Sequence, residues 1–369
     1  MPPPWKRIVA APASRLSHVP RRVQRYFVIY ATLLIAAWVS WKWIFQPDWE
    51  SNRAIEKSLN EDKVFFGSNM RPEFSDMIQI KSMDTRLLPS DENFKQRLVI
   101  VGDVHGCKDE LQALLDKVKF RAPHDHLTLT GDMISKGPDS AGVVSLARSL
   151  SASCVRGNHE DRMLLALADM RGHHAALPGP AEDPTDAQDL LDEESFSHGD
   201  YTFRSLAREF DDKQIKWLQA CPVILRVGEI AGLGEMVVVH AGLVPGIPLE
   251  RQDPYHVMNM RTIDLDTRLP SENREGTPWE KLWNKYQSHV PPQSAERSSV
   301  VYGHDSKRGK NIHKYSFGLD SGCVAGGRLT ALVIEAGRKG EVAKTRTVDV
   351  KCKTYWQKSQ SKTNNKSET

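Results

Sequence analysis

The stretch VIVGDVHGC, residues 99–107, sets the pattern of the whole chain. It opens with Val99, Ile100 and Val101, which favour a buried strand. It closes with Asp103 and His105, two positions apart at the end of that strand. Side chains at this spacing point to the same side, so they can bind one cation together.

Four later segments repeat this order of apolar strand and polar end. LTLTGD ends in Asp132, CVRGNHED carries Asn158 and His159, VVVHAG contains His240, and VVYGHD contains His304. In an open α/β sheet the loops that leave the carboxyl ends of the strands share one edge, so these side chains can converge. Carboxylate, imidazole and amide ligands without thiolate favour zinc, manganese or cobalt, with iron and magnesium as further candidates.

The number of candidate ligands is enough for two divalent ions. A carboxylate has two oxygens and can bridge, which makes Asp132 the expected shared ligand. We expect one ion on Asp103, His105 and Asp132, and the other on Asp132, Asn158, His240 and His304. Two ions about 4 Å apart clamp phosphoryl oxygens for in-line displacement.

In the order GD-x-HG, GD, GNH[ED] and two later histidines, residues 97–335 resemble the metallophosphoesterases of the phosphoprotein phosphatase superfamily. The resemblance implies an α/β fold, with a central β-sandwich flanked by helices and a two-metal site at its edge. It implies the metal ligands assigned above, with His159 as the acid that protonates the leaving group. It also places Lys136 and Arg156 where the family holds phosphate. Asp305, which follows His304, is expected to orient either His304 or His159.

The second block departs from the protein phosphatases. There the family has GD-x-VDRG, whereas this chain has GDMISKG, with Ser135 in place of the second aspartate. A hydroxyl supports an imidazolium less well than a carboxylate does, so protein Ser/Thr phosphatase activity is disfavoured. Symmetrical dinucleoside tetraphosphatases also lack that carboxylate, and LDSGCVAGGRLTAL is similar to their last block.

The chain has a tail with six basic and no acidic residues before residue 26, an apolar span at 26–45, and the segments GDMISKGPDS and YGHDSKRGKNI. Together with this domain subtype, these features resemble the fungal vacuolar endopolyphosphatases. The resemblance implies internal cleavage of inorganic polyphosphate by a domain in the vacuole lumen, with Lys136, Arg156 and Arg261 as phosphate contacts. Lys307 and its basic neighbours Arg308 and Lys310 either steer the substrate or form a solvated charge run. The alternatives are a symmetrical dinucleoside tetraphosphatase, then a protein Ser/Thr phosphatase, then a non-catalytic membrane-tethered binding module.

Residues 26–45, YFVIYATLLIAAWVSWKWIF, contain one charged residue and are long enough as a helix to cross the roughly 30 Å hydrocarbon core of a bilayer. A cleaved signal peptide and a buried helix are the alternatives. Six basic residues and no acidic one precede residue 26, which predicts a cytosolic N-terminus and a catalytic domain on the other side, at the vacuole membrane.

The expected organisation is a basic tail (1–25), a transmembrane helix (26–45), a stalk (46–96), a metallophosphoesterase domain (97–350) and a polar tail (351–369). Residues 172–197 and 245–297 are expected to be insertions. The net charge is +3, and the six N-terminal charges leave −3 for the rest. A body of that charge lacks the basic surface of a nucleic-acid-binding protein, so nucleic acid is not expected as a partner.

The five cysteines are scattered, with no C-x-x-C pair. We expect mostly free, buried thiols, and disulfides only if the body lies in an oxidising compartment.

Overall fold

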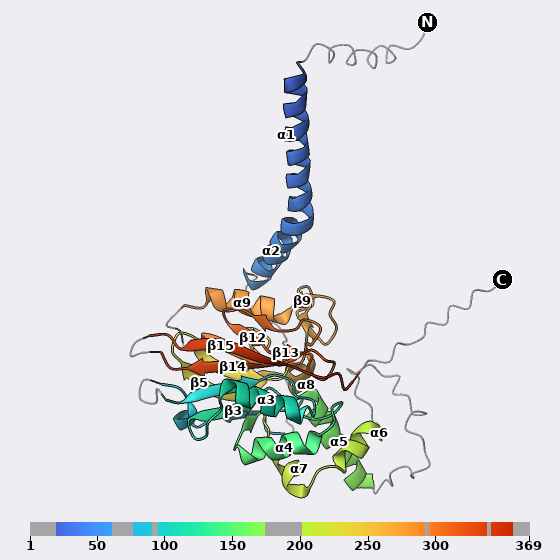
Figure 1. Cartoon of the computed structure of the whole chain (residues 1–369), viewed down its shortest axis with the longest axis vertical. Coiled ribbons are helices and arrows are strands. Elements are labelled where there is room, and N and C mark those ends of the chain that lie inside the picture. The colour runs from blue at the N-terminus through green and yellow to red at the C-terminus, as the bar shows by residue number, and fades with distance from the viewer. Residues whose placement is uncertain are drawn as a thin grey trace, which may run out of the picture. The chain divides into compact units, whose positions relative to one another are not determined.

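The computed structural model describes residues 20–60, 77–90, 95–173, 201–291, 294, 296–337 and 341–356. The chain divides into two compact units, residues 1–60 and 61–369, and each is described by itself. Figure 1 shows the elements of both. Most of the insertion expected at 172–197 lies outside the described residues.

The first unit is a helix that continues past the expected span. It consists of α1 (Arg21–Ser40), a π-helical turn η3 (Trp41–Phe45) and α2 (Gln46–Asn60). The large apolar side chains of α1 and η3 are exposed, and the helix is the one candidate membrane span among the described residues. The first part of the expected stalk is helical, because RAIEKSLN consists largely of residues that tolerate or favour a helix.

The second unit contains two six-stranded sheets. Sheet A has the order β1 (Ile80–Ser82), β5 (Ile224–Ile230), β6 (Gly234–Val239), β10 (Ser298–Tyr302), β12 (Ser316–Gly318) and β11 (Asn311–Ile312). Sheet B has the order β13 (Asp320–Ser321), β14 (Arg328–Glu335), β2 (Arg97–Val101), β3 (Asp125–Leu129) and β4 (Ser153–Cys154), with β15 (Lys344–Lys351) paired to β14.

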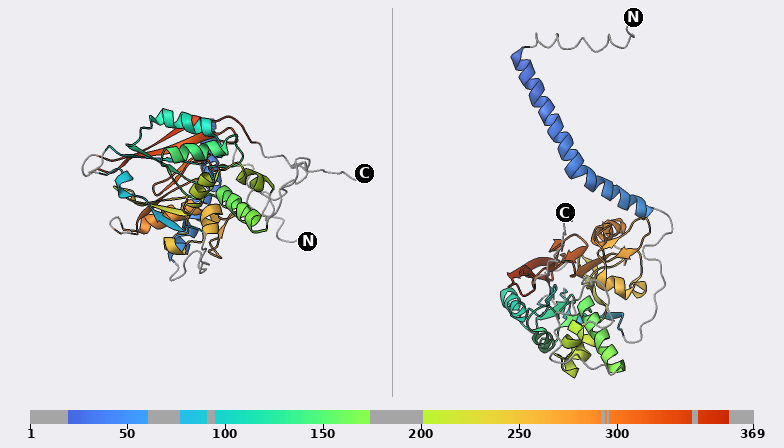
Figure 2. Two further views of the ribbon diagram at one scale, coloured as in Figure 1. Left: turned by 90° about the horizontal axis from the view of Figure 1, so that it is seen from below. Right: turned by 90° about the vertical axis from the view of Figure 1, so that its right-hand side faces the viewer.

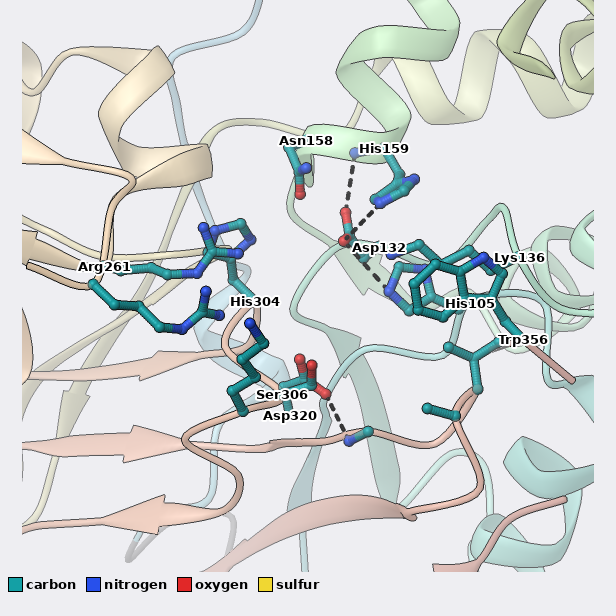
Figure 3. A pocket seen from close by; sticks show the side chains of 15 residues that line it. His105, Asp132, Lys136, Asn158, His159, Arg261, His304, Ser306, Asp320 and Trp356 are labelled. Atoms are coloured by element: carbon teal, nitrogen blue, oxygen red, sulfur yellow. Dashed lines mark hydrogen bonds and ion pairs between the residues drawn. The ribbon is translucent and has the colours of Figure 1, made fainter. Parts of the chain in front are cut away.

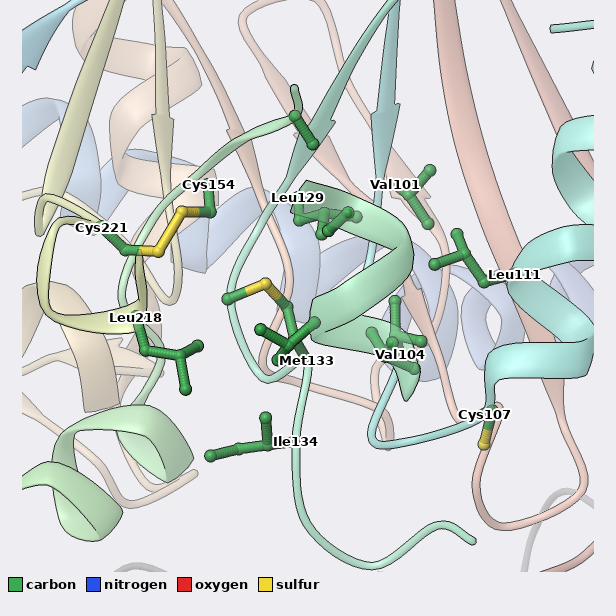
Figure 4. Packing of buried hydrophobic residues seen from close by; sticks show 14 of the residues in the cluster. Val101, Val104, Cys107, Leu111, Leu129, Met133, Ile134, Cys154, Leu218 and Cys221 are labelled. Carbon is green, nitrogen blue, oxygen red and sulfur yellow. A yellow bond between two sulfur atoms is a disulfide. The ribbon is translucent and has the colours of Figure 1, made fainter. Parts of the chain in front are cut away.

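Alternation along β2 explains how the two layers are held. Val99 and Val101 pack into the cluster beneath the helices (Figure 4), whereas Leu98 and Ile100 pack into a second cluster with residues of sheet A. Successive side chains of a strand point to opposite faces of the sheet, so a strand in which every residue is apolar is expected to be buried on both faces.

The crossover helices are α3 (Lys108–Val118) between β2 and β3, and α4 (Ser140–Ser149) between β3 and β4. Around them lie α5 (Asn158–His173), α6 (Tyr201–Ala207) and α7 (Asp212–Gln219). Helix α9 (Trp279–His289) lies on the opposite side of the sheets from α3 (Figures 1 and 2). The flanked sandwich that we expected is therefore confirmed.

Parallel pairing brings the polar strand ends together. Strands β2, β3 and β4 run parallel in sheet B, and β6 and β10 run parallel in sheet A. The loops after these strands carry the candidate ligands. Residues 245–297 supply α8 (Pro254–Asn259), α9 and a small sheet of β7 (Thr262–Ile263), β8 (Pro270–Ser271) and β9 (Thr277–Pro278).

Two expectations about the body need correction. β1 pairs with β5, and Met83 and Leu88 are buried, so sheet A begins inside the expected stalk. At the C-terminal end, residues 352–356 pack on the body instead of belonging to a free tail.

The expectation of free thiols is also wrong. Disulfides join Cys154 to Cys221 and Cys323 to Cys352, and Cys107 is the one free cysteine, buried beneath α3. The partners are 67 and 29 residues apart in the chain, and only the fold brings them together. Burial raises the pKa of the Cys107 thiol to about 12, so this thiol is not a nucleophile at neutral pH.

Candidate metal centre

The site lies where the strand-end loops of both sheets meet, and tight backbone turns hold its ligands. His105, Asp132 and His304 have φ values of 46°, 47° and 70°, in the left-handed region. Gly131 precedes Asp132, and a Cβ there would lie 2.8 Å from Nδ1 of His240, so the close approach of the two loops requires glycine. Backbone strain of this kind is typical of a functional site.

Asp132 is at the centre of the cluster (Figure 3), and imidazoles approach both of its oxygens. Nε2 of His105 and of His159 lie 3.6 and 3.9 Å from Oδ2 of Asp132. On the other side, Nε2 of His240 lies 3.3 Å from Oδ1 of Asp132 and 3.1 Å from Nδ1 of His304. Two buried groups thus share Asp132, one with His105 and His159 and one with His240 and His304.

Three of the imidazoles are each held from behind by a backbone carbonyl. Nδ1 of His105 lies 3.1 Å from Ile134 O, and Nδ1 of His240 lies 2.9 Å from Thr130 O. Nε2 of His304 lies 2.9 Å from Asn259 O. A carbonyl oxygen can only accept a hydrogen bond, so the ring nitrogen facing it carries a hydrogen, and the other ring nitrogen of each histidine is the one available to a metal ion.

That arrangement fits metal ions. Nδ1 of His304 and Nε2 of His240 lie 3.1 Å apart, close enough for a proton on His240 to join them, and a cation can take the place of that proton. Two ligands of one ion, each about 2.1 Å from it, lie at most about 4.2 Å apart, and the four distances to Asp132 and between His240 and His304 given above are within that limit. Buried His and Asp groups of this chain can therefore hold two divalent ions, as expected.

Asn158 joins the second group. Its amide end lies 3.0 Å from Nε2 of His240 and 3.2 Å from both carboxylate oxygens of Asp132. The Asn158 side-chain oxygen occupies this position and faces only hydrogen-bond acceptors, which is unfavourable without a cation. A cation bound between these groups would make the same oxygen a suitable ligand.

Asp103 lies beside the cluster, outside both groups of converging atoms. Its carboxylate accepts from the His304 backbone N–H at 3.0 and 3.1 Å. Burial, together with Asp320 and Asp132, raises the pKa of Asp103 well above its usual range. Asp320 lines the pocket, although it is not among the residues that we singled out from the sequence. Asp320 comes directly after the apolar segment SFGL, and the other candidate ligands also follow apolar strands. This placement is the sequence signal that could have identified it.

The electrostatics of Asp132 and His240 are those of an ion pair. Burial acts to raise the pKa of Asp132, but the imidazoles of His240 and His159 outweigh it and hold the pKa well below its usual range. Burial acts to lower the pKa of His240, and the Asp132 carboxylate raises it overall. A cation that replaces the proton on His240 therefore finds an ionised carboxylate beside it.

Glu160 fixes the Asp132 loop. Its carboxylate accepts from the backbone N–H groups of Asp132 and Met133, both at 2.8 Å, and of Gly157 at 2.9 Å. Burial raises the pKa of Glu160 to about 7, against the effect of these donors. This buried side chain explains why an acidic residue follows GNH: it ties the GNH turn to the GD loop.

His159 differs from the three carbonyl-held histidines. Within the described residues its Nδ1 is buried without a hydrogen-bond partner. The ring is held by packing against His105, at 4.9 Å between centroids, and Phe203, at 5.5 Å. Ser135, which stands where protein phosphatases have an aspartate, instead uses its backbone N–H to reach Ser140 Oγ. Burial and the nearby Lys136 hold the pKa of His159 well below its usual range.

The pocket over this cluster has cationic walls. Lys136, Arg261, Arg274 and Lys307 all line it, and Trp356 lies under the Lys136 ammonium at 5.4 Å from the ring centroid. In Figure 3 Arg261 and Lys136 lie on opposite sides of Asp132. Arg274 and Trp356 were not predicted as site residues, because nothing in their local sequence distinguishes them, whereas Lys307 belongs to the basic run for which substrate steering was one of two expectations.

Arg156 is placed elsewhere. Its side chain is 5% exposed, lies 3.3 Å from Asp161 Oδ1 and donates to Gln219 O at 3.2 Å. It is not among the residues that line the pocket, and its role as a phosphate contact stays a prediction. A buried guanidinium needs internal partners, and Arg156 has them behind the GNH turn.

Residues 96–326 match the family model of the calcineurin-like phosphoesterases. The chain is 29% identical over 280 residues to the zinc-dependent endopolyphosphatase of Saccharomyces cerevisiae, covering 70% of this chain and 82% of that one. It is 30% identical over 272 residues to a symmetrical bis(5'-nucleosyl)-tetraphosphatase of Vibrio campbellii, covering 63% and 93%.

Among solved structures, a putative diadenosine tetraphosphatase aligns with a TM-score of 0.53 and 28% identity, covering 74% of this chain and 97% of the other. The order of the motifs, the flanked sandwich and the paired metal-binding groups agree with these matches. The chain belongs to the calcineurin-like phosphoesterase family.

Proposed function

We propose that this chain is a membrane-anchored, two-metal endopolyphosphatase that cleaves inorganic polyphosphate internally. The observation that carries this proposal is the pocket itself, which has cationic side chains on both sides of the metal-binding groups. A substrate cleaved internally has phosphates on both sides of the scissile bond, so it needs such contacts in both directions. Similarity to the yeast endopolyphosphatase supports the same substrate class.

The proposed ligands are Asp103, His105 and Asp132 for one ion and Asp132, Asn158, His240 and His304 for the other. Bound there, the two ions supply Lewis-acid stabilisation of phosphoryl oxygens and activate the attacking water. Asp103 would require a small movement of its carboxylate away from the His304 N–H.

The remaining steps belong to the side chains of this chain. Lys136 and Arg261 hold the phosphate oxygens and offset the negative charge that develops as water attacks phosphorus. The negative charge of bound polyphosphate favours the protonated form of His159, against the effect of burial and Lys136 on its pKa. His159 then donates its proton to the oxygen that leaves with the second phosphate, so the P–O–P bond opens into two phosphate ends. Among the described residues no carbonyl lies behind His159, in contrast to His105, His240 and His304, and this supports an acid over a ligand.

A symmetrical dinucleoside tetraphosphatase is the second candidate, and one observation favours it. Trp356 lines the pocket, and an indole face is a platform on which a base can stack. In the structure, however, that ring faces the Lys136 ammonium. The tetraphosphatase relatives have a level of identity similar to that of the endopolyphosphatase.

The test compares kcat/KM of the full-length chain, in detergent and with zinc, manganese or cobalt, for long-chain polyphosphate and for diadenosine tetraphosphate. We expect polyphosphate to be the better substrate. A preference for diadenosine tetraphosphate, with a larger loss on that substrate for Trp356→Ala, would replace the proposal by the second candidate.

For location, we propose one span with a cytosolic N-terminus and a catalytic domain in the vacuole lumen. The exposed apolar helix and the basic residues before it support this topology. The two disulfides give independent support, since they persist in oxidising compartments. Protease added to sealed vacuoles should leave the catalytic domain intact, and digestion of the domain would reverse the topology.

A further inference from the structure

Arg274 reaches the pocket from the insertion that carries the small sheet. It lies in the turn between β8 and β9. The hydroxyl of Thr262 in β7 lies 2.8 Å from the carbonyl oxygens of both Asn273 and Glu275, which flank Arg274 on either side. The turn is therefore fastened to the sheet where Arg274 leaves it.

One carboxylate connects Arg274 to Arg261. Oδ1 of Asp305 accepts a hydrogen bond from Arg274 at 2.9 Å and lies 3.9 Å from Nε of Arg261. Its Oδ2 lies 3.3 Å from Nε of Arg308, whose other end contacts Glu280 at 2.7 Å. Asp305 thus holds three guanidinium groups in fixed positions, and two of them line the pocket.

The exposures of these side chains separate their roles. Arg261 and Asp305 are 7% and 9% exposed, whereas Arg274 is 35% exposed. Arg261 therefore lies deep in the pocket, and Arg274 is at its rim, in contact with solvent. A rim guanidinium oriented by a buried carboxylate loses little conformational entropy when it binds an anion.

The basic run after His304 is divided by the fold. Arg308 is engaged by Glu280 and Asp305, and Lys310 lies 3.7 Å from Asp349. Lys307 is exposed, lines the pocket and has no acidic partner within the described residues. Of the three, Lys307 is the side chain placed to meet a substrate anion.

We propose that Arg274 and Lys307 form a subsite for phosphates of the substrate chain beyond the scissile bond, on the Arg261 side of the metal centre. The subsite selects for polyanion length and does not act on the reacting phosphorus. It rests on the proposed function for the identity of the polyanion, and on the pocket geometry for its position. Asp305 is its positioning residue.

The experiment measures kcat and KM of full-length variants for long-chain polyphosphate, tripolyphosphate and p-nitrophenyl phosphate. For Arg274→Met we expect kcat/KM on long-chain polyphosphate to fall about tenfold, mainly through KM, the factor that one charge-assisted hydrogen bond supplies. The loss should shrink with tripolyphosphate and be smallest with p-nitrophenyl phosphate. For Lys307→Met we expect the same ranking of the three substrates, with about a threefold loss of kcat/KM on long-chain polyphosphate.

Matched controls separate this effect from a general loss of positive charge. Arg346 on β15 is exposed and paired with Glu335, and Lys310 is in the same basic run as Lys307 but does not line the pocket. Arg346→Met and Lys310→Met should retain wild-type KM for long-chain polyphosphate. Arg274→Lys, which keeps the charge, should recover part of the loss.

An equal loss for all three substrates would overturn the subsite, as would a loss no larger than that of the controls. Calorimetry of long-chain polyphosphate binding to the same variants distinguishes this failure from failure of the proposed function. If the wild-type chain neither binds nor cleaves polyphosphate, the proposed function is wrong. The subsite is then tested by comparing the loss of kcat/KM that Arg274→Met causes on diadenosine tetraphosphate with the loss on p-nitrophenyl phosphate. Equal losses on the two substrates overturn it.

Discussion

The floor and the rim of the pocket are built in different ways. The floor, which we define as His105, Asp132, His240 and His304, is buried, and its side chains follow strands and are fixed by backbone carbonyls or turns. The rim, which we define as Arg274, Lys307 and Trp356, is partly or fully exposed and comes from an insertion, a loop and the C-terminal segment.

This difference separates chemistry from selection. Floor residues have their lone pairs set by partners behind them, so a small displacement affects the reaction itself. Rim residues have room to move and contact solvent, so changes there affect which substrate binds and how tightly. Floor mutations should therefore act on kcat and metal content, and rim mutations on KM.

The largest effect is expected at Asp132, the residue shared by both metal-binding groups. Asp132→Asn removes the charge between the two groups and should lower kcat/KM at least about a thousandfold. Elemental analysis of the variant should show loss of bound metal. Activity within tenfold of wild type would remove Asp132 from the centre of the site.

His159→Ala tests whether His159 is a metal ligand, like the histidines of the floor, or the general acid. We expect kcat to fall about a hundredfold or more, as for loss of a general acid. Both metals should remain bound, because His159 lacks the carbonyl partner of the other three. If metal is lost with the activity, His159 is a ligand, and the acid must be sought elsewhere.

Trp356→Ala tests the rim opposite Arg274. Loss of the ring beneath Lys136 should raise KM for long-chain polyphosphate about two- to fivefold, the range of a cation–π contact. Trp356→Phe keeps an aromatic face and serves as the matched variant. A large fall in kcat with unchanged KM would contradict the division between floor and rim.

The smallest effects on activity should come from the two disulfides. Cys323→Ser with Cys352→Ser frees the segment that holds Trp356 and should raise KM about twofold, less than loss of the ring itself. Cys154→Ser with Cys221→Ser opens a longer loop away from the rim and should lower stability by about 3 kcal/mol with KM retained. Thermal melts and KM values, measured side by side, check both. An equal KM change for the two pairs would contradict the account.

Much of the floor was predictable because each ligand follows a strand, and parallel strands end at one edge. The division of these side chains between the two metal-binding groups was harder to predict. The sequence could not show that Asp103 turns to the His304 N–H, or that His159 lies as close to Asp132 as a ligand does. These details depend on turn geometry between loops that are far apart in the chain.

Arg274 and Trp356 were not predictable for a different physical reason. Trp356 is in a polar segment without periodicity, and contacts with Val324, the bridge from Thr354 to Ala325 and the Cys323–Cys352 bond bring it to the pocket. Arg156, which the resemblance offered as a phosphate contact, lies beside Asp161 for the same kind of reason. Contacts between segments distant in sequence leave no local pattern to read.

Internal cleavage of polyphosphate is the central claim, and a time course of long-chain polyphosphate digestion resolved by length on a gel tests it most directly. The full-length chain with bound metal should give intermediate lengths early, while the longest chains disappear, and Asp132→Asn should give none. Gradual shortening of all chains with release of single phosphates would contradict the claim, because it would show that the enzyme works from chain ends.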